Sequence, residues 1–304
     1  MTAEHLAQAP DGPAAEHVLV EKDGPVARLI LNRPDKHNAM PFIAFDQLVA
    51  ALHEAEEDDE IKVIILKGNG PSFCAGHDLN DVGYVYGYNE HRTEEQKRGR
   101  RPSQRVRLQF DRKLVDNYLA FHYAMKPVIA QVHGWCVGAG IYLVELVDLA
   151  ICAESTRFSH AEQRLAFAGN SWQLNTELLT FGPKKTRELL LLGDEFDGPQ
   201  AVQMGLVNRS VPEAELDATV EDWAERVARN SKDSLVMGRA VHHMALDSLG
   251  GSQQFIRGYL GHTLATNIRF EPDEYNFFKA RRDEGTRTGF HARDAHYGDQ
   301  RERH

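Results

Sequence analysis

The chain has 304 residues, a length that suits one large domain or one domain with a smaller appendage. Its composition, 42% hydrophobic and 26% charged, is ordinary for a globular protein with a sizeable core. The formal net charge of −10 argues against nucleic acid as the main partner, because phosphate binding requires a basic surface. No apolar run reaches the ~18 residues that a membrane-spanning helix needs, so no membrane partner is expected.

Three cysteines, Cys74, Cys136 and Cys152, each lie in an apolar or small-residue stretch. An odd count without a CxxC motif or a cysteine–histidine cluster argues against a disulfide framework and against a zinc site. We therefore expect buried, reduced thiols in a cytoplasmic protein, and no bound metal.

Strand-like and helix-like segments alternate in the first two thirds of the chain. Helical spacing of apolar residues predicts a helix over 42–57, and a short β-rich run precedes it at 26–31. Continuous apolar runs predict strands buried on both faces at 62–67, 128–132 and 149–153. Strands separated by helices indicate an α/β fold with parallel strands.

From about residue 213 the pattern becomes helical. Amphipathic spacing predicts four helices with no strand between them, at 216–229, 234–249, 253–266 and 272–282. We expect a leader over 1–16 that is flexible and lacks a signal-peptide core, an α/β domain over 17–212, and a helical region over 213–304. The helical region would serve oligomerisation and end in a polar surface tail from residue 283.

The segment from 80 to 125 is long and polar, with Tyr84, Tyr86 and Tyr88 at alternating positions. Within it, residues 97–113 hold eight Lys or Arg residues and a single acid, Asp111. The segment is either a solvated helix face with a loop, or a lid or pocket wall whose basic residues attract a phosphorylated ligand.

Two segments rich in small residues directly follow predicted buried strands. They are Ser72–Leu79 and His133–Tyr142. Small residues let backbone N–H groups approach a ligand closely, and a helix start offers unbonded donors with a positive dipole end. Two such turns side by side could bind one developing oxyanion, although tight packing would explain the glycines as well.

The paired segments resemble those of the enoyl-CoA hydratase/isomerase (crotonase) superfamily. The likeness covers roughly residues 18–282 and rests on ordered motifs at 32–40, 73–79, 126–140, 148–153, Phe158, Glu162, 191–196, Ala201 and 205–207. It implies a crotonase-like spiral of ββα turns followed by a helical region that builds homotrimers, often paired into homohexamers. It also implies an acyl-CoA thioester substrate, and no cofactor beyond the coenzyme A moiety.

The resemblance further implies roles for individual residues. The backbone N–H groups of His77 and Ala139 would form an oxyanion hole. Contacts to coenzyme A would come from the carbonyls near Ala39 and Ala75 at the adenine amino group, from Leu79, and from Lys36 and Arg281 near the phosphates, Arg281 from a neighbouring subunit.

Typical hydratases of this family hold a water between two glutamates. Glu162 matches the second glutamate, whereas Tyr142 stands at the first position and Glu145 lies three residues further on. A tyrosine with an ordinary pKa of about 10 is a poor base at neutral pH. We therefore expect Glu162 to act as general acid/base, with Tyr142 donating a hydrogen bond or shaping the pocket.

The segment after Glu162 also departs from the family's usual Gly/Pro-rich turn. Asn170 and Trp172 could line an acyl pocket there and, with the 80–125 segment, enclose a bulky, cyclic or aromatic acyl group. His160 is expected to be a structural histidine, with a second titrating group as the alternative.

Three functions remain open. The leading hypothesis is an enoyl-CoA hydratase or isomerase that acts on an unusual acyl chain. The second is a relative that cleaves a carbon–carbon bond, either a hydratase-lyase or a β-diketone hydrolase. The third is a non-catalytic protein that binds coenzyme A thioesters or RNA, for which the basic stretch is the best support.

Overall fold

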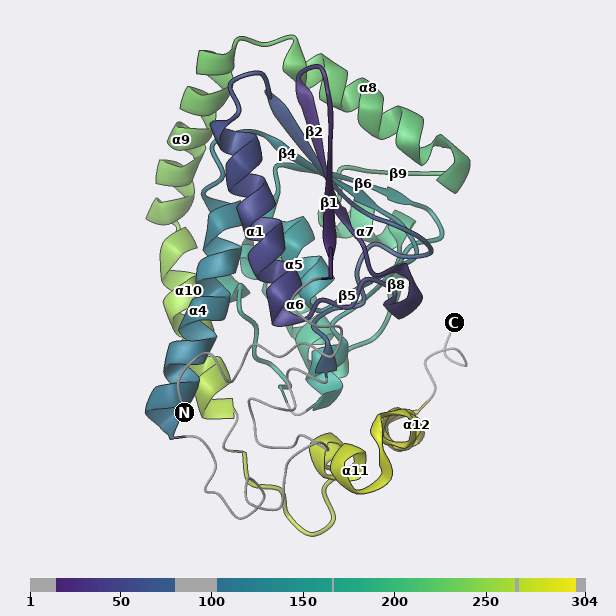
Figure 1. Cartoon of the computed structure of the whole chain (residues 1–304). Coiled ribbons are helices and arrows are strands. Elements are labelled where there is room, and N and C mark those ends of the chain that lie inside the picture. The colour runs from purple at the N-terminus through teal and green to yellow at the C-terminus, as the bar shows by residue number, and fades with distance from the viewer. Residues whose placement is uncertain (1–14, 80–102, 166, 266–267, 299–304) are drawn as a thin grey trace.

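The computed structural model describes residues 15–79, 103–165, 167–265 and 268–298. A six-stranded sheet runs through it in the order β1-β2-β3-β4-β6-β9 (Figure 1). Its first pair is antiparallel and every other neighbouring pair is parallel, which confirms the expected α/β class. The strands are β1 (Val18–Asp23), β2 (Val26–Leu31), β3 (Val63–Gly68), β4 (Val128–Val132), β6 (Leu149–Ala153) and β9 (Arg209–Val211).

Different helices cover the two faces of this sheet. On one face, Val63 and Ile65 of β3 pack with the apolar side of α8 (Leu216–Ala228). On the other face, Ile64 and Leu66 join a larger core. That core includes residues of α1 (Phe42–Glu57), α4 (Gln104–His122) and α5 (Ala139–Leu146). Successive residues of one strand thus enter two cores, which is why its sequence is apolar without alternation.

A second, three-stranded sheet has the order β5-β7-β8. Its strands are β5 (Trp135–Val137), β7 (Arg157–Ser159) and β8 (Phe196–Asp197). β5 follows β4 of the main sheet and leads into α5, and β7 follows β6 and leads through η3 (Ala161–Leu165) to α6 (Leu174–Leu192). β8 leads into α7 (Gly198–Met204). This repeated step from one sheet to the other and into a helix is the ββα spiral that the sequence predicted.

Most predicted boundaries agree with the structure. β2, β4, β6 and α1 coincide with their predicted ranges, and β3 lies one residue further along the chain. α8, α9 (Lys232–Ser248) and α10 (Gly251–Ala265) begin within two residues of prediction. α11 (Phe277–Glu284) begins at Phe277 rather than at residue 272, because the Asn276 side chain caps it by accepting from the Lys279 N–H at 3.0 Å.

The prediction of a polar surface tail from residue 283 was wrong for most of that segment. The helix α12 (Thr286–Tyr297) forms there and packs on α11. Phe290 lies 5.2 Å from Phe277 between ring centroids, and the Tyr275 hydroxyl donates to the Gly289 carbonyl at 2.8 Å. Phe290 thus packs with the apolar side of α11, although the segment around it is rich in charged residues.

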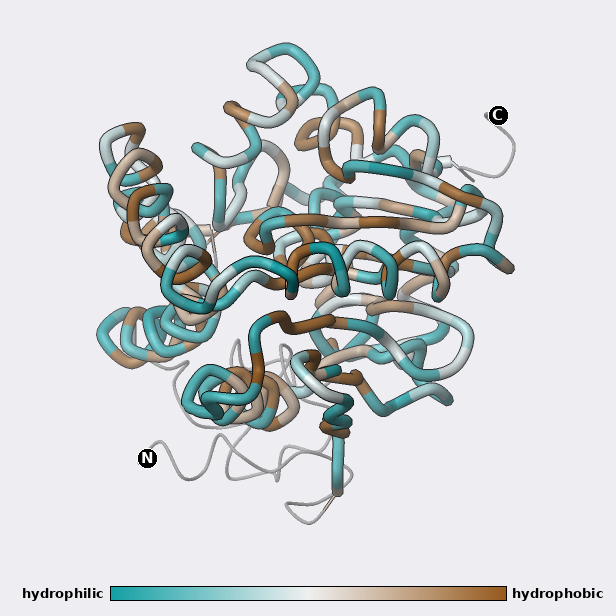
Figure 2. Tube along the Cα trace, turned by 90° about the horizontal axis from the view of Figure 1, so that it is seen from above, coloured by the Kyte–Doolittle hydropathy of each residue, from teal (hydrophilic) through white to brown (hydrophobic). Residues whose placement is uncertain are grey.

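The view from above shows how hydrophobic and hydrophilic residues are distributed along the chain. Figure 2 shows hydrophobic residues gathered in the central strands and helix turns that alternate between hydrophobic and hydrophilic. Among the described helices, none is long and apolar enough to cross a bilayer. The leader is described only from residue 15, where the Ala15 carbonyl accepts from the Gln47 side chain at 3.0 Å.

Gly134 lies where the turn after β4 passes the turn after β3. Its φ of 56° is in the left-handed region that favours glycine. A Cβ at this position would lie 2.0 Å from the carbonyl oxygen of Pro71 and 2.9 Å from the Cα of Ser72. The close approach of the two turns therefore depends on this glycine.

We predict that Gly134→Ala lowers the free energy of unfolding by about 3 kcal/mol, because it combines backbone strain with overlap against the neighbouring turn. Urea unfolding at one fixed protein concentration checks this. Gly238→Ala in α9 is the matched control, since nothing lies within 4 Å of an added Cβ there. That change should raise stability by about 0.5–1 kcal/mol. Equal stability of the two variants would contradict the prediction.

Candidate active site

The two segments rich in small residues lie side by side, held by backbone hydrogen bonds. The Cys74 N–H donates to the Trp135 carbonyl at 3.0 Å, and the Val137 N–H donates to the Cys74 carbonyl at 2.9 Å. The second segment therefore contains a short strand, β5, before its helix, which the sequence did not predict. The pairing brings the backbone of His77 and of Ala139 to the wall of one pocket.

The backbone N–H groups of His77 and Ala139 both lack an acceptor within the described residues. On the first segment, the Met40 N–H donates to the Gly76 carbonyl and the Asp78 N–H donates to the Met40 carbonyl, each at 2.8 Å. This parallel bridge leaves the N–H of His77 on the opposite side of the backbone. Ala139 is the first residue of α5, where helix geometry provides no internal acceptor.

The signature at 32–40 fixes the first segment in place. Asn38, with a φ of 55°, donates to the carbonyls of Asn69 at 2.9 Å and Ser72 at 2.7 Å. The Arg33 guanidinium forms an ion pair with Asp78 at 2.9 Å, and both side chains are nearly buried. The residues before α1 thus hold the loop that carries His77.

Glu162 is anchored through one of its two carboxylate oxygens. The Tyr142 hydroxyl donates to Oε1 at 2.8 Å, and Nδ1 of His160 lies 3.0 Å from the same atom. Oε2 has no partner among the described residues and lies 3.1 Å from the position that a Cβ on Gly138 would take. The absence of a side chain at Gly138 therefore leaves the unbonded oxygen beside the residue that precedes Ala139.

The charges of Glu162 and His160 are linked. Burial alone would raise the pKa of Glu162, but the neighbouring His160, with the Tyr142 hydroxyl, brings that pKa below its ordinary value. Burial would lower the pKa of His160, yet Glu162 and Glu177 raise it. Burial and the nearby carboxylates hold the pKa of Tyr142 well above 10, so its hydroxyl keeps its proton. Glu162 is thus a carboxylate held between the imidazole of His160 and the phenol of Tyr142.

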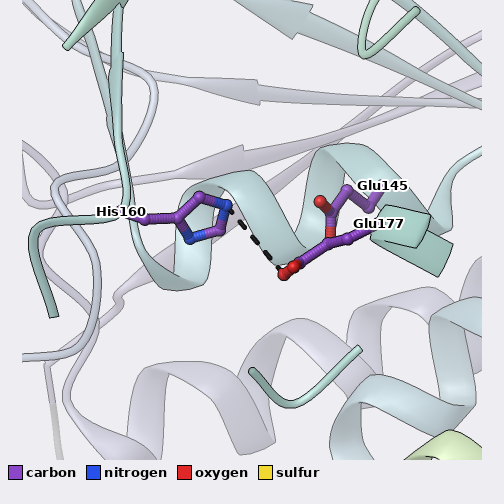
Figure 3. Close-up of side chains that lie close together, drawn as sticks. All are labelled: Glu145, His160 and Glu177. Carbon is purple, nitrogen blue, oxygen red and sulfur yellow. Dashed lines mark ion pairs between the residues drawn. The ribbon is translucent and has the colours of Figure 1, made fainter. Parts of the chain in front are cut away.

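Beside Glu162 lies a second set of titratable side chains, of which His160 and Glu177 are buried and Glu145 is half-buried. Figure 3 shows the His160 ring facing the carboxylate of Glu177, with Glu145 beside it. One ligand-type atom from each of the three lies within 4.8 Å of the others, so among the described residues this is a set whose chemistry could suit a metal ion. Glu145 could have been suspected from its place one helical turn after Tyr142, whereas nothing in the sequence marked Glu177.

The His77 side chain packs against α1 and α4. Its Nε2 lies 2.9 Å from the Tyr118 hydroxyl, and its ring contacts Phe42 and Phe45. Burial lowers the pKa of His77 to about 4, so its imidazole is neutral at physiological pH. His77 therefore offers its backbone N–H to the pocket while its ring supports α1 and α4.

A pocket of about 500 Å³ extends from the two N–H groups and Glu162. Asn170 and Trp172 line it, as the sequence suggested. His262 of α10 stacks on Phe167 with ring centroids 4.9 Å apart and lies 4.3 Å from Trp172. The sequence missed this histidine and two further lining residues, Phe278 of α11 and Phe290 of α12. Much of the lining is thus aromatic and comes from the last helices.

The residues expected to contact coenzyme A are spread around this pocket. Ala75 and Leu79 line it, and Lys36 is exposed at the end of η2 (Pro34–Lys36), next to the lining residue His37. The Ala39 carbonyl accepts from the Arg33 guanidinium at 2.7 Å, so one of its two acceptor positions is occupied.

Arg281 has a different place from the one expected. Its side chain is 1% exposed and hydrogen-bonds to the Leu79 carbonyl. Within this chain it holds α11 against the first segment, and its contact with the coenzyme A phosphates of a neighbouring subunit stays a prediction.

The long polar segment is described only from residue 103. The alternating tyrosines at 84–88 and the start of the basic stretch lie outside the described residues. In the described part, Arg107 and Asp111 of α4 are buried, and Asp111 lies 3.1 Å from Nδ1 of His262. One face of α4 therefore supports the pocket wall, while the basic residues Arg105, Arg112 and Lys113 lie on an exposed face of the same helix.

Comparison with known proteins agrees with this geometry. The family model for enoyl-CoA hydratase/isomerase matches residues 21–258. A peroxisomal Delta(3,5)-Delta(2,4)-dienoyl-CoA isomerase of Arabidopsis thaliana is 31% identical over 219 residues, which are 70% of this chain and 75% of that protein. A hydroxycinnamoyl-CoA hydratase-lyase of Pseudomonas fluorescens is 33% identical over 217 residues, or 70% and 72% of the two chains.

The fold comparison extends over nearly the whole chain. The crystal structure of an enoyl-CoA hydratase/isomerase from Xanthobacter autotrophicus Py2 superposes with a TM-score of 0.78 at 27% identity. The superposition covers 93% of this chain and 99% of that one. Together with the family match over residues 21–258, these similarities show that the chain is an enzyme of the enoyl-CoA hydratase/isomerase family.

Proposed function

We propose that this enzyme acts on a bulky, aromatic or cyclic acyl-CoA thioester, with Glu162 as the general acid/base. The observation that carries the proposal is the position of Glu162. Its unbonded Oε2 lies next to Gly138, on the same pocket wall as the N–H groups of His77 and Ala139. The carboxylate of Glu162, as proton acceptor, and the two N–H groups, as oxyanion donors, would thus act on a substrate in the same pocket.

The proposed chemistry follows from the weak acidity of a thioester. When a proton leaves the α-carbon, or when water adds to the β-carbon, negative charge develops on the thioester oxygen. The two N–H groups would stabilise that charge, and one such donor contributes about 3–4 kcal/mol. Glu162 would take a proton from carbon or water and return it to a second carbon. These steps require no cofactor beyond the coenzyme A moiety.

A carbon–carbon bond-cleaving activity is the second candidate, as a hydratase-lyase or a β-diketone hydrolase. It is favoured by Tyr142, which occupies the place of a second carboxylate and donates to Glu162. The similarity to a hydroxycinnamoyl-CoA hydratase-lyase supports the hydratase-lyase form. A non-catalytic RNA- or coenzyme A-binding role is set aside, because the chain belongs to an enzyme family and retains Glu162 at the pocket.

A panel of enoyl-CoA thioesters, followed by loss of the conjugated thioester absorbance, tests the proposed reaction. We predict that Glu162→Gln lowers kcat/KM by at least about 100-fold, because it removes the proton acceptor. Tyr142→Phe should lower it by about 10-fold, the value of one hydrogen bond to a charged group. Glu154→Gln, at an exposed position, should have no effect. Unchanged turnover in Glu162→Gln would refute the catalytic assignment. Mass spectrometry for a shortened acyl-CoA separates cleavage from hydration.

The aromatic lining predicts the acyl preference. We expect 3-aryl-acryloyl-CoA to be turned over with a kcat/KM at least about 10-fold above that of the four-carbon enoyl-CoA, since burial of a ring contributes about 1–3 kcal/mol. Trp172→Ala should remove most of this difference while the value for the short substrate changes little. A short-chain preference in the unaltered enzyme would contradict the proposed acyl class.

We also propose that the enzyme is a homotrimer or homohexamer that associates through α9 and α10. Each helix exposes apolar residues spaced three or four apart, which places them on one face. On α9 these are Met237, Val241 and Met244, at 68%, 64% and 74% exposure, and on α10 Ile256, Leu260 and Leu264, at 51%, 43% and 70%. Such stripes on a monomer surface are typical of a contact region.

We predict that the double change Val241→Asp and Met244→Asp yields a smaller species than the unaltered enzyme, because it charges the middle of the α9 stripe. Light scattering coupled to gel filtration measures the mass. Gln203→Asp, at an exposed position of α7, is the control and should leave the mass unchanged. If the double variant has the same mass as the unaltered enzyme, the apolar stripe of α9 is not the subunit contact.

A further inference from the structure

The buried groups behind Glu162 come from three elements and lie outside the pocket lining. His160 immediately precedes η3, Glu177 lies on α6, and Glu145 lies on α5 one turn after Tyr142. His160 bonds Glu162 through Nδ1 at 3.0 Å, and its Nε2 lies 4.0 Å from Oε1 of Glu177. The imidazole therefore connects the pocket carboxylate to a second carboxylate in the interior.

Several polar atoms of this set have no hydrogen-bond partner among the residues that the structure describes. They are Nε2 of His160, Oε2 of Glu177 and both carboxylate oxygens of Glu145. His160 is 1% exposed and Glu177 is fully buried. An unsatisfied buried polar atom is unfavourable, so protons, a water or a cation must be shared among these atoms.

The distances between these polar atoms bear on whether the set holds a cation or a hydrogen-bonded water. A tetrahedral zinc site with ligands at about 2.0–2.1 Å places neighbouring ligand atoms about 3.4 Å apart. A water with hydrogen bonds of about 2.8 Å places its partners about 4.6 Å apart. Nε2 of His160 and Oε1 of Glu177 lie 4.0 Å apart, which is longer than the separation of two zinc ligands, and ligand-type atoms of all three residues lie within 4.8 Å of one another. The groups are thus close enough to share protons through a water.

The charge of the set requires a bound proton. Three ionised carboxylates beside one imidazolium would leave two uncompensated negative charges in the interior, which is strongly unfavourable. Burial raises the pKa of Glu145 well above its ordinary value, and Glu177 and Glu162 raise it further. Burial also raises the pKa of Glu177, against the opposing effect of His160. The causes that shift the pKa of Glu145 all raise it, whereas His160 and the Ser171 hydroxyl oppose the rise at Glu177, so the proton is assigned to Glu145.

We propose that Glu145, Glu177 and His160 form a buried proton-holding network in which Glu145 is a neutral acid and His160 is an imidazolium that positions Glu162. In this arrangement Oε1 of Glu162 is held by Tyr142 and His160, and Oε2 is turned to the reactant. The role of His160 for the reaction rests on the proposed function, whereas the protonation of Glu145 does not.

The network predicts in which direction the activity depends on pH. The groups that face His160 are Glu162, Glu177 of α6, and Tyr142 and Glu145 of α5. The imidazolium favours the ionised form of Glu162, so the base is available down to a lower pH than it would be alone. Removal of the imidazole removes that effect, and the pKa of Glu162 rises because of its burial.

The test of His160 is the pH profile of kcat/KM for the best substrate of the panel. His160→Gln should move the acid limb to higher pH by about one unit or more, which corresponds to the loss of a nearby opposite charge. His53→Gln, an exposed histidine of α1, is the matched control and should leave the limb in place. A lower rate in His160→Gln with an unmoved limb would show a structural role and overturn the positioning assignment.

Two measurements on the unaltered enzyme test the network without turnover. At neutral pH, infrared difference spectra against Glu145→Gln should reveal the C=O stretch of a protonated carboxylic acid. The ¹⁵N resonances of His160 should keep the imidazolium pattern above the ordinary histidine pKa of about 6.5. An ionised Glu145, a neutral His160, or one tightly bound metal ion per chain by elemental analysis would each overturn the proposal. If no acyl-CoA reacts, the proposed function fails and these spectra still decide the network.

Discussion

Two backbone hydrogen bonds, between Cys74 and Trp135 and between Cys74 and Val137, are the constraint on which the site depends. They pair a loop that follows β3 with a short strand that follows β4, and these two strands are neighbours in the main sheet. Because the strands are parallel, their carboxyl ends meet at one edge, and the loops that follow must lie together. The packing of the sheet between its two cores thus sets the distance between two donors that are far apart in the sequence.

Tyr142 shapes the environment of Glu162. A second ionised glutamate at that position would repel Glu162, whereas the phenol donates to it at 2.8 Å. The same oxygen is held by His160, whose own charge is favoured by Glu177. The single oxygen Oε1 thus accepts from Tyr142 and lies beside His160, whose ring in turn faces Glu177.

The sequence predicted the fold well because its signals were local. Continuous apolar runs identified strands buried on both faces, and the segments rich in small residues after them identified the two loops that pair at the pocket. The contacts around Glu162 were not predictable in the same way, since Glu177 and His160 meet only through the packing of α6 against η3. Phe290 was missed for a different reason. Its segment is rich in charged residues, and a single aromatic residue among them does not predict a buried helix face. Arg281 was given a coenzyme role by resemblance, and only the folded chain shows it bonded to Leu79.

The helix α12 has a bearing on how enzymes of this kind diverge. The match to the family model ends at residue 258, yet α11 and α12 lie beyond it and supply Phe278, Phe290 and Arg293 to the pocket wall. One part of the pocket wall therefore lies beyond the stretch that the family model matches, while Glu162, Asn170 and Trp172 lie within it. Changes in the last few dozen codons would alter that part of the wall and leave Glu162 and the two paired loops unchanged. Alignments restricted to the shared core would group such enzymes together while the residues that distinguish them go uncompared.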